Sequence, residues 1–214
     1  MESEWNHITT EKEKESIKRY LEAELCYMPS NNFYSHPHNL TIRNLAVSII
    51  AKHWRGVEID AFVPYLAMNY FDTLVSHYEE KPYSEIDQVP LVATACLNIA
   101  AKIRKFSDDF YLKDFDPDAI KEVELRIRNN LEGLTKPVTP FCFLDHFYPP
   151  FQRIGGFKRR CINEIIVQAK GEDDFIEYKP SDIAFHSFVA ASCIAKLMMG
   201  LSSAKIPVCG IMDY

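Results

Sequence analysis

The chain has 214 residues, of which 47% are hydrophobic, and this is enough apolar material for a sizeable core in one large domain or two small ones. Its net charge of −6 argues against a general binder of nucleic acids or anionic membranes, because no strong positive field attracts phosphates. The acidic, polar N-terminus does not fit a signal peptide, and no apolar run is long enough to span a bilayer. We therefore expect a soluble protein of the nucleus and cytoplasm.

The long segments repeat their apolar residues at spacings of three and four, which predicts an all-α protein. A first helix is expected from about residue 10 to 27, opened by a capping box of Thr10 and Glu13 and closed before Pro29. An unstructured tail is expected at the end of the chain. The remaining helices are predicted over residues 39–54, 58–78, 87–104, 117–134, 140–152, 156–170 and 180–199.

Two prolines, Pro137 and Pro140, mark the candidate domain boundary. Within residues 39–134 we expect five helices, with 87–104 enclosed by the others because only this helix is apolar on every side. The predicted parts are an N-terminal helix and loop, an N-terminal helical domain, a partial C-terminal domain and a tail. They cover residues 1–36, 37–136, 137–199 and 200–214.

Three charged side chains lie in segments that otherwise have the character of a core: Arg43, Asp72 and Lys102. Burying an unpaired charge is costly, so we expect Arg43 and Asp72 to pair across two helices. The alternative is that Asp72 faces solvent, since periodicity alone does not fix its direction. Lys102 ends its helix, where a cation either simply complements the helix dipole or points at a partner protein.

Four successive segments occur in a characteristic order: "IRNLAVSIIAKH", "YLAMNYFDTLVS", "PLVATACLNIAAK" and "KEVELRIRNNLEGLTKPVTPF". Together they resemble a cyclin box, nearest to a divergent subgroup of the plant D-type cyclins. The resemblance extends over about residues 20–200 and implies a cyclin-like five-helix bundle followed by a partial second one. Five positions match the box signature of the family: Arg43, Asp72, Leu91, Lys102 and Glu124. In cyclins the arginine and aspartate pair internally, whereas the resemblance assigns Lys102, Glu124 and Leu91 to the kinase-binding surface. It also implies that Lys102 and Glu124 lie side by side on an exposed face.

The chain departs from the family pattern at the rim of that surface. Arg104 and Lys105 stand where cyclins usually carry an acidic pair, so we expect altered association rates and partner choice. In the peptide-docking patch of the first box helix, Ile49 stands where many cyclins carry a tryptophan, and Lys52 stands where they carry an acidic residue. The retinoblastoma-binding Leu-x-Cys-x-Glu motif is also missing. The degenerate docking patch is assigned to Ile42, Leu45, Ile49 and Lys52.

The second domain is expected to be incomplete. About 75 residues follow Pro137, enough for roughly three helices where a complete cyclin fold has five. We expect this shortage to leave Ile183, Phe188 and Ile194 without their usual cover.

Catalytic and metal sites have poor candidates in the sequence. His36 and His38 are a close pair in a proline-containing loop, but no other residues at metal-ligand spacing accompany them. Cys161 and His186 could form a catalytic thiol–imidazole pair, but only their presence in the same sequence supports this. No glycine-rich phosphate loop is present. The six cysteines have no CxxC pair and mostly apolar neighbours. This pattern favours buried thiols in a reducing compartment, and the alternative is a disulfide framework or a metal site. The cysteines are Cys26, Cys96, Cys142, Cys161, Cys193 and Cys209.

We therefore expect a protein that is not an enzyme and uses no cofactor or metal. The resemblance implies a regulatory subunit that binds and activates a cyclin-dependent protein kinase in G1/S control of the cell cycle, with no direct nucleic-acid or membrane partner. The alternative from another class is a degenerate cyclin-fold interaction module that does not productively activate a kinase. An unrelated helical enzyme is the third possibility.

Overall fold

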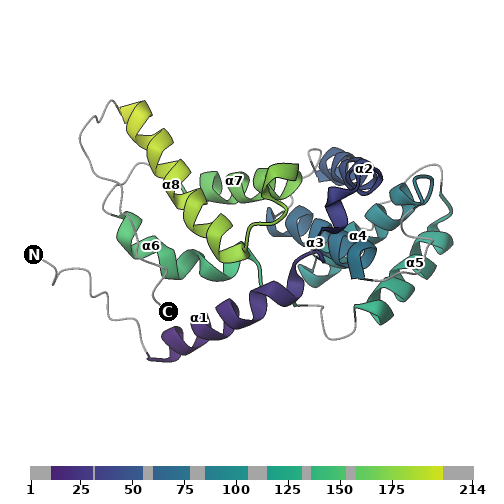
Figure 1. The fold of residues 1–214 in the computed structure, drawn as a ribbon, viewed down its shortest axis with the longest axis horizontal. Helices are drawn as coiled ribbons and strands as arrows, with labels where there is room; N and C mark the ends of the chain where they lie inside the picture. Colours follow the sequence, from purple (N-terminus) through teal and green to yellow (C-terminus); the bar gives the residue numbers. More distant parts are fainter. Residues whose placement is uncertain are drawn as a thin grey trace, which may run out of the picture. The chain divides into compact units, whose positions relative to one another are not determined.

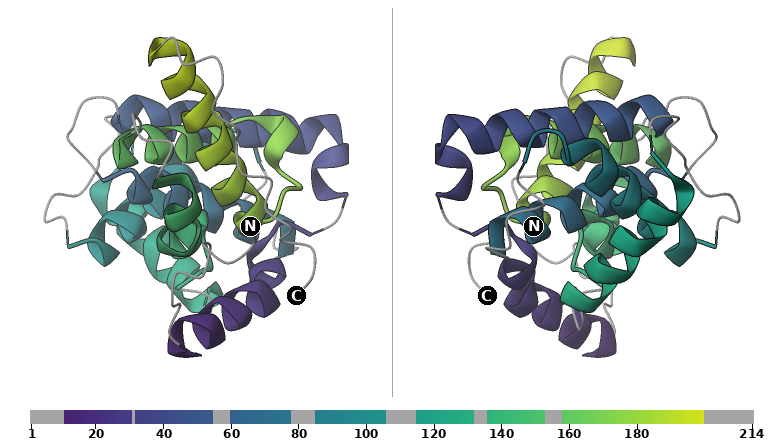
Figure 2. Two further views of the ribbon diagram at one scale, coloured as in Figure 1. Left: turned by 90° about the vertical axis from the view of Figure 1, so that its left-hand side faces the viewer. Right: turned by 90° about the vertical axis from the view of Figure 1, so that its right-hand side faces the viewer.

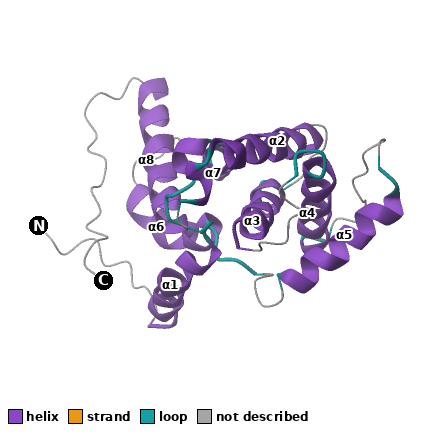
Figure 3. Cartoon of the chain, turned by 45° about the vertical axis from the view of Figure 1, so that its right-hand side comes forward, coloured by secondary structure: helices purple, strands orange, loops and turns teal. Residues whose placement is uncertain are grey.

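The computed structural model describes residues 11–30, 32–54, 60–77, 85–105, 115–131, 136–152 and 158–199, and these form α-helices, short 3-10 helices and connecting turns, with no strand among them (Figures 1 and 3). The all-α prediction is confirmed. Each predicted helix has a counterpart, although the Thr10 half of the capping box and the tail over residues 200–214 lie outside the described residues. The α-helices are α1 Glu11–Ala23, α2 Pro37–Trp54, α3 Phe62–His77, α4 Val89–Ile103, α5 Pro117–Asn130, α6 Leu144–Gln152, α7 Arg159–Gly171 and α8 Pro180–Met199.

Proline determines where several helices begin. α2, α5 and α8 each start at a proline, whose fixed φ suits the first helical position and whose missing N–H would have no partner there. α2 therefore starts at Pro37, before the predicted residue 39. Asp116 is the N-cap of α5, because its side chain accepts a hydrogen bond of 3.0 Å from the backbone N–H of Asp118.

The described residues group into two units. The box unit contains residues 25–137 and 167–177, and the second unit contains the described parts of residues 1–24, 138–166 and 178–214. The units group three segments differently from the predicted domains. α1 groups with the second unit, whereas residues 25–36 and the end of α7 group with the box unit. Helix periodicity does not reveal such long-range grouping.

The box unit is built around α3 and α4. α4 contacts α2, α3 and α5, and these helices lie together in the box unit (Figures 2 and 3). Ala93, Cys96 and Ala100 have no exposed surface, so the prediction of an enclosed helix is confirmed. Enclosure is not confined to this helix, because α3 is also buried continuously from Val63 to Val75 although it contains polar residues. The described part of residues 39–134 contains four α-helices, one fewer than expected.

The second unit has an aromatic core. The rings of Phe151 on α6 and Phe188 on α8 stack with centroids 5.2 Å apart, and Tyr20 of α1 packs edge-on against Phe143 at 5.9 Å. The expectation that Ile183 and Phe188 lack cover is wrong, since both are buried where α8 contacts α6 and the 3-10 helix Pro140–Phe143. Ile194, in contrast, is 51% exposed.

A buried carboxylate joins the end of the N-terminal segment of the second unit to α8. Glu24 accepts hydrogen bonds from both the backbone N–H and the hydroxyl of Ser181, each at 2.9 Å. Burial raises the pKa of Glu24, although the bonds from Ser181 oppose that shift. Glu24 therefore supplies an acceptor to the first turn of α8 from a distant part of the sequence.

The cysteines agree only in part with the sequence analysis. None of the five described cysteines forms a disulfide, and Cys96 is buried. The prediction of buried thiols is wrong for Cys26 and Cys161, which are exposed, and Cys209 lies outside the described residues. None of the helices that the structure describes combines the length and apolar character needed to cross a membrane.

Candidate functional site

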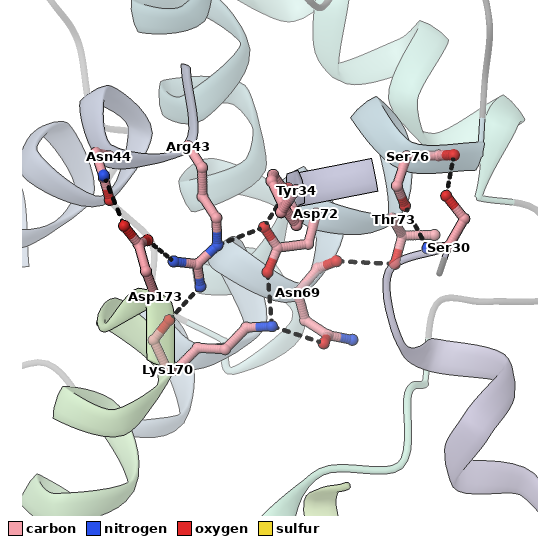
Figure 4. Close-up of polar contacts among 10 residues, drawn as sticks. All are labelled: Ser30, Tyr34, Arg43, Asn44, Asn69, Asp72, Thr73, Ser76, Lys170 and Asp173. Carbon is pink, nitrogen blue, oxygen red and sulfur yellow. Dashed lines mark hydrogen bonds and ion pairs between the residues drawn. The ribbon is translucent and has the colours of Figure 1, made fainter. Parts of the chain in front are cut away.

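The structure brings Arg43 of α2 and Asp72 of α3 together in the interior of the box unit (Figure 4). The Arg43 Nε donates to Asp72 Oδ1 at 3.2 Å, and both side chains are almost fully buried. The Tyr34 hydroxyl donates to the same carboxylate oxygen at 2.7 Å. The alternative in which Asp72 faces solvent is therefore wrong, and the aspartate holds Arg43 in place.

Sequence reasoning missed two further members of this charged cluster, Lys170 and Asp173. The Lys170 Nζ lies 2.7 Å from Asp72 Oδ2, and Asp173 Oδ1 lies 3.3 Å from Arg43 Nη1. Burial opposes ionisation of Asp72, but Lys170 and Arg43 outweigh it and hold the pKa of this carboxyl below its usual value. Burial also lowers the pKa of the Lys170 ammonium, although Asp72 opposes that shift.

Lys102 and Glu124 also lie side by side, although they are 22 positions apart in the sequence. The Lys102 Nζ at the end of α4 donates to Glu124 Oε2 on α5 at 2.7 Å. Asn98, one turn earlier on α4, donates to the other carboxylate oxygen at 2.9 Å. The Lys102 side chain is 34% exposed, whereas that of Glu124 is only 8% exposed, because Asn98 draws the carboxylate inward. The expectation that both side chains occupy an exposed face is wrong for Glu124.

Two apolar side chains flank this pair at the surface. Ile103 follows Lys102 and is 42% exposed, and Leu125 follows Glu124 and is 61% exposed. Large apolar groups with this exposure offer contact area to a partner. Leu91 is different, because it is buried near the opposite end of α4 and presents little surface in this conformation.

The two basic residues after Lys102 have different environments. Arg104 forms an ion pair with Asp60, and its guanidinium lies 5.1 Å from the centre of the Phe62 ring. Asp60 also accepts from the backbone N–H of Phe62, at the start of α3. Arg104 is thus engaged within the chain, whereas Lys105 is exposed and has a left-handed backbone with φ 62°. The expected charge inversion of the rim therefore depends chiefly on Lys105.

Residues 15–134 match the family model described as the cyclin N-terminal domain, and this segment is more than half of the chain. The chain belongs to the cyclin family. It is 29% identical over 208 residues to Cyclin-D1-1 of Arabidopsis thaliana, covering 90% of this chain and 60% of that protein. It is also 29% identical over 188 residues to putative cyclin-D6-1 of Arabidopsis thaliana, with coverage of 79% and 61%.

Cyclin-D4-2 of Oryza sativa subsp. japonica is 26% identical over 190 residues, covering 80% of this chain and 49% of that protein. The predicted resemblance to plant D-type cyclins is confirmed by these relatives. The chain spans about half to three-fifths of the length of these relatives.

The docking patch assigned to this cyclin by resemblance is not one continuous surface. Ile42 is fully buried because α2 turns it toward the core, so its assignment to a surface patch is wrong. Leu45 and Ile49 pack partly against the same core, and only Lys52 is exposed. Within the described ranges, no group of three or more histidine, cysteine or acidic side chains is placed to hold a metal ion.

Proposed function

We propose that this cyclin is a regulatory subunit that binds and activates a cyclin-dependent protein kinase in G1/S control of the plant cell cycle, acting in the nucleus and cytoplasm. The observation that carries the proposal is the contact between Lys102, in the last turn of α4, and Glu124, in the middle of α5. The cyclin family and the plant D-type relatives support it. The protein itself would carry out no chemistry.

The geometry suggests how the surface divides its roles. Exposed apolar area on Ile103 and Leu125 would supply most of the binding free energy. The partly exposed Lys102 ammonium would donate charge-assisted hydrogen bonds to the kinase and fix the register of the complex. Activation would follow by population shift, because the cyclin binds the active arrangement of the kinase regulatory helix more tightly than the inactive one.

Lys105 is proposed to influence partner choice. Its backbone N–H donates to the Lys102 carbonyl at 3.0 Å, and among the described residues no acidic side chain pairs with it as Asp60 pairs with Arg104. An exposed cation at the rim of an interface changes association rates and discriminates among partners more than it sets affinity. We therefore expect kinases with an acidic residue opposite Lys105 to bind faster than those with a basic one.

A second candidate is a cyclin-fold interaction module that binds a kinase without activating it. This reading is favoured by the Glu124 carboxylate, both of whose oxygens are already engaged by Asn98 and Lys102. Such a carboxylate has less capacity to accept hydrogen bonds from a partner. Binding and activation must therefore be measured separately.

The experiment is a binding titration of the full chain against a panel of plant cyclin-dependent kinases, followed by a phosphorylation assay on each complex. We expect Lys102→Ala and Leu125→Ser each to weaken binding about tenfold, since each removes roughly 1–2 kcal/mol at the interface. Lys158→Ala is the matched control, because this exposed lysine belongs to the second unit and is not on α4 or α5.

The possible results separate the two candidates. Binding with stimulated phosphorylation supports the kinase-activating subunit, and binding without phosphorylation supports the interaction module. Failure of the wild-type chain to bind any kinase of the panel would contradict both. Binding that both Lys102→Ala and Leu125→Ser leave unchanged would show that the surface is assigned wrongly.

A further inference from the structure

Residues 167–177 belong to the box unit although they follow its main segment by about thirty positions. They comprise the last turn of α7 and the 3-10 helix Asp173–Phe175. Figure 4 shows this segment meeting Arg43 and Asp72 from the side opposite Tyr34. Ile176, near its end, packs against the apolar core of the box unit.

The charged groups at this contact alternate in sign. Asp173 lies 3.3 Å from Arg43, Arg43 lies 3.2 Å from Asp72, and Asp72 lies 2.7 Å from the Lys170 ammonium. The segment supplies both ends of this row, and the helices α2 and α3 supply its middle. Asp173 is 38% exposed, whereas the Lys170 side chain is only 11% exposed.

The guanidinium of Arg43 depends on the segment for most of its hydrogen bonds. Its Nη1 donates to Asp173, and its Nη2 donates to the backbone carbonyl of Lys170 at 2.5 Å. Only the Nε bond goes to Asp72. A buried guanidinium that loses acceptors incurs a desolvation penalty, so detaching the segment would destabilise Arg43 as well. Asn44 on α2 adds a further bond to Asp173 at 3.0 Å.

We propose that residues 167–177 form a strap that closes the box unit, with Asp72 as its anchor. Asp72 separates two cations that enter from different elements, Arg43 from α2 and Lys170 from α7. Without the Asp72 charge these cations repel each other in a poorly solvated site, and the strap is released. The box unit is therefore complete only when a segment from beyond its main boundary is attached.

The test is a suppressor experiment on the full chain. Asp72→Asn should lower the urea midpoint, and adding Lys170→Met should recover part of that loss, because the second change removes the uncompensated cation. The matched control is Lys121→Met in the Asp72→Asn background, which removes an exposed cation of α5 that is not part of the charged cluster and should recover nothing. A double variant no more stable than Asp72→Asn alone would overturn the proposal.

A second measurement applies even if Asp72→Asn does not fold. Asp173→Ala should increase hydrogen exchange at the Phe175 and Ile176 amides about tenfold, since these amides bond within the strap and report its local opening. The Leu131 amide at the end of α5 should exchange as in the wild type. Unchanged exchange at Phe175 and Ile176 would show that the charges do not hold the strap.

Discussion

Replacing Glu124 with alanine tests the contact that joins α4 to α5. This carboxylate accepts from Asn98 through one oxygen and from Lys102 through the other, and the two helices pack against each other. We expect the substitution to lower the free energy of unfolding by roughly 3 kcal/mol, which is large for a single side chain.

Three contributions give this magnitude. The buried Asn98 amide loses an acceptor, which costs about 1–3 kcal/mol. Removal of a buried methylene from Glu124 adds about 1 kcal/mol. The Lys102 side chain is one-third exposed, so after solvent screening its ion pair adds at most about 1 kcal/mol. Hydrogen bonding to Asn98 therefore contributes more than the ion pair.

The assay is urea denaturation followed by far-ultraviolet circular dichroism. Glu122→Ala is the matched control, because this exposed carboxylate on α5 pairs with Arg126 one turn away and its loss should cost less than about 0.5 kcal/mol. Glu124→Gln keeps one acceptor for Asn98 and should fall between wild type and Glu124→Ala. Equal midpoints for Glu124→Ala and Glu122→Ala would refute the reasoning.

Three further predictions concern other parts of the chain. Lys105→Gly should raise the free energy of unfolding by about 0.5–1 kcal/mol relative to Lys105→Ala, since glycine adopts the observed φ of 62° without strain, and equal denaturation midpoints would contradict this. Arg104→Glu should lower that free energy by about 1 kcal/mol because it sets a like charge against Asp60, whereas Lys105→Glu should change it by less than about 0.5 kcal/mol in the same titration. Burial raises the folded-state pKa of Glu24 above its ordinary 4.5, so its contribution to stability is fullest below that pH and is lost as pH rises through the folded value. Glu24→Gln, which keeps an acceptor for Ser181, should remove this loss when unfolding is measured between about pH 4 and pH 7, and an unaltered pH profile would count against it.

The helices could be predicted well from the sequence because their signals are local. Apolar spacing placed each α-helix, and proline or a capping aspartate marked several starts. The burial of α3 was underestimated because Asn69, Asp72 and Thr73 interrupt its apolar pattern. All three are nevertheless buried, since Asp72 has charged partners and Thr73 bonds to the carbonyl of Asn69. A polar side chain breaks the pattern even where its hydrogen bonds are satisfied inside the core.

The candidate surface was predictable only in part. The side-by-side placement of Lys102 and Glu124 followed from family resemblance, but the burial of Glu124 depends on Asn98, whose role has no local sequence signal. Arg104 was assigned to the rim of the surface, and its pairing with Asp60 was missed because Asp60 lies 44 positions earlier. Periodicity assigns residues to a face of one helix and cannot say which side chain from another helix will meet them.

The charged cluster shows which further signal a sequence can carry. Arg43 was correctly expected to need a partner, but a guanidinium has five N–H donors arranged as a fork, and one carboxylate cannot satisfy all of them in a dry interior. A buried Arg43 therefore predicts more acceptors than Asp72 alone. The structure supplies them from Asp173 and from the Lys170 carbonyl, 130 and 127 positions away. Counting unsatisfied donors thus predicts that additional partners exist, and only the fold determines that they come from the strap.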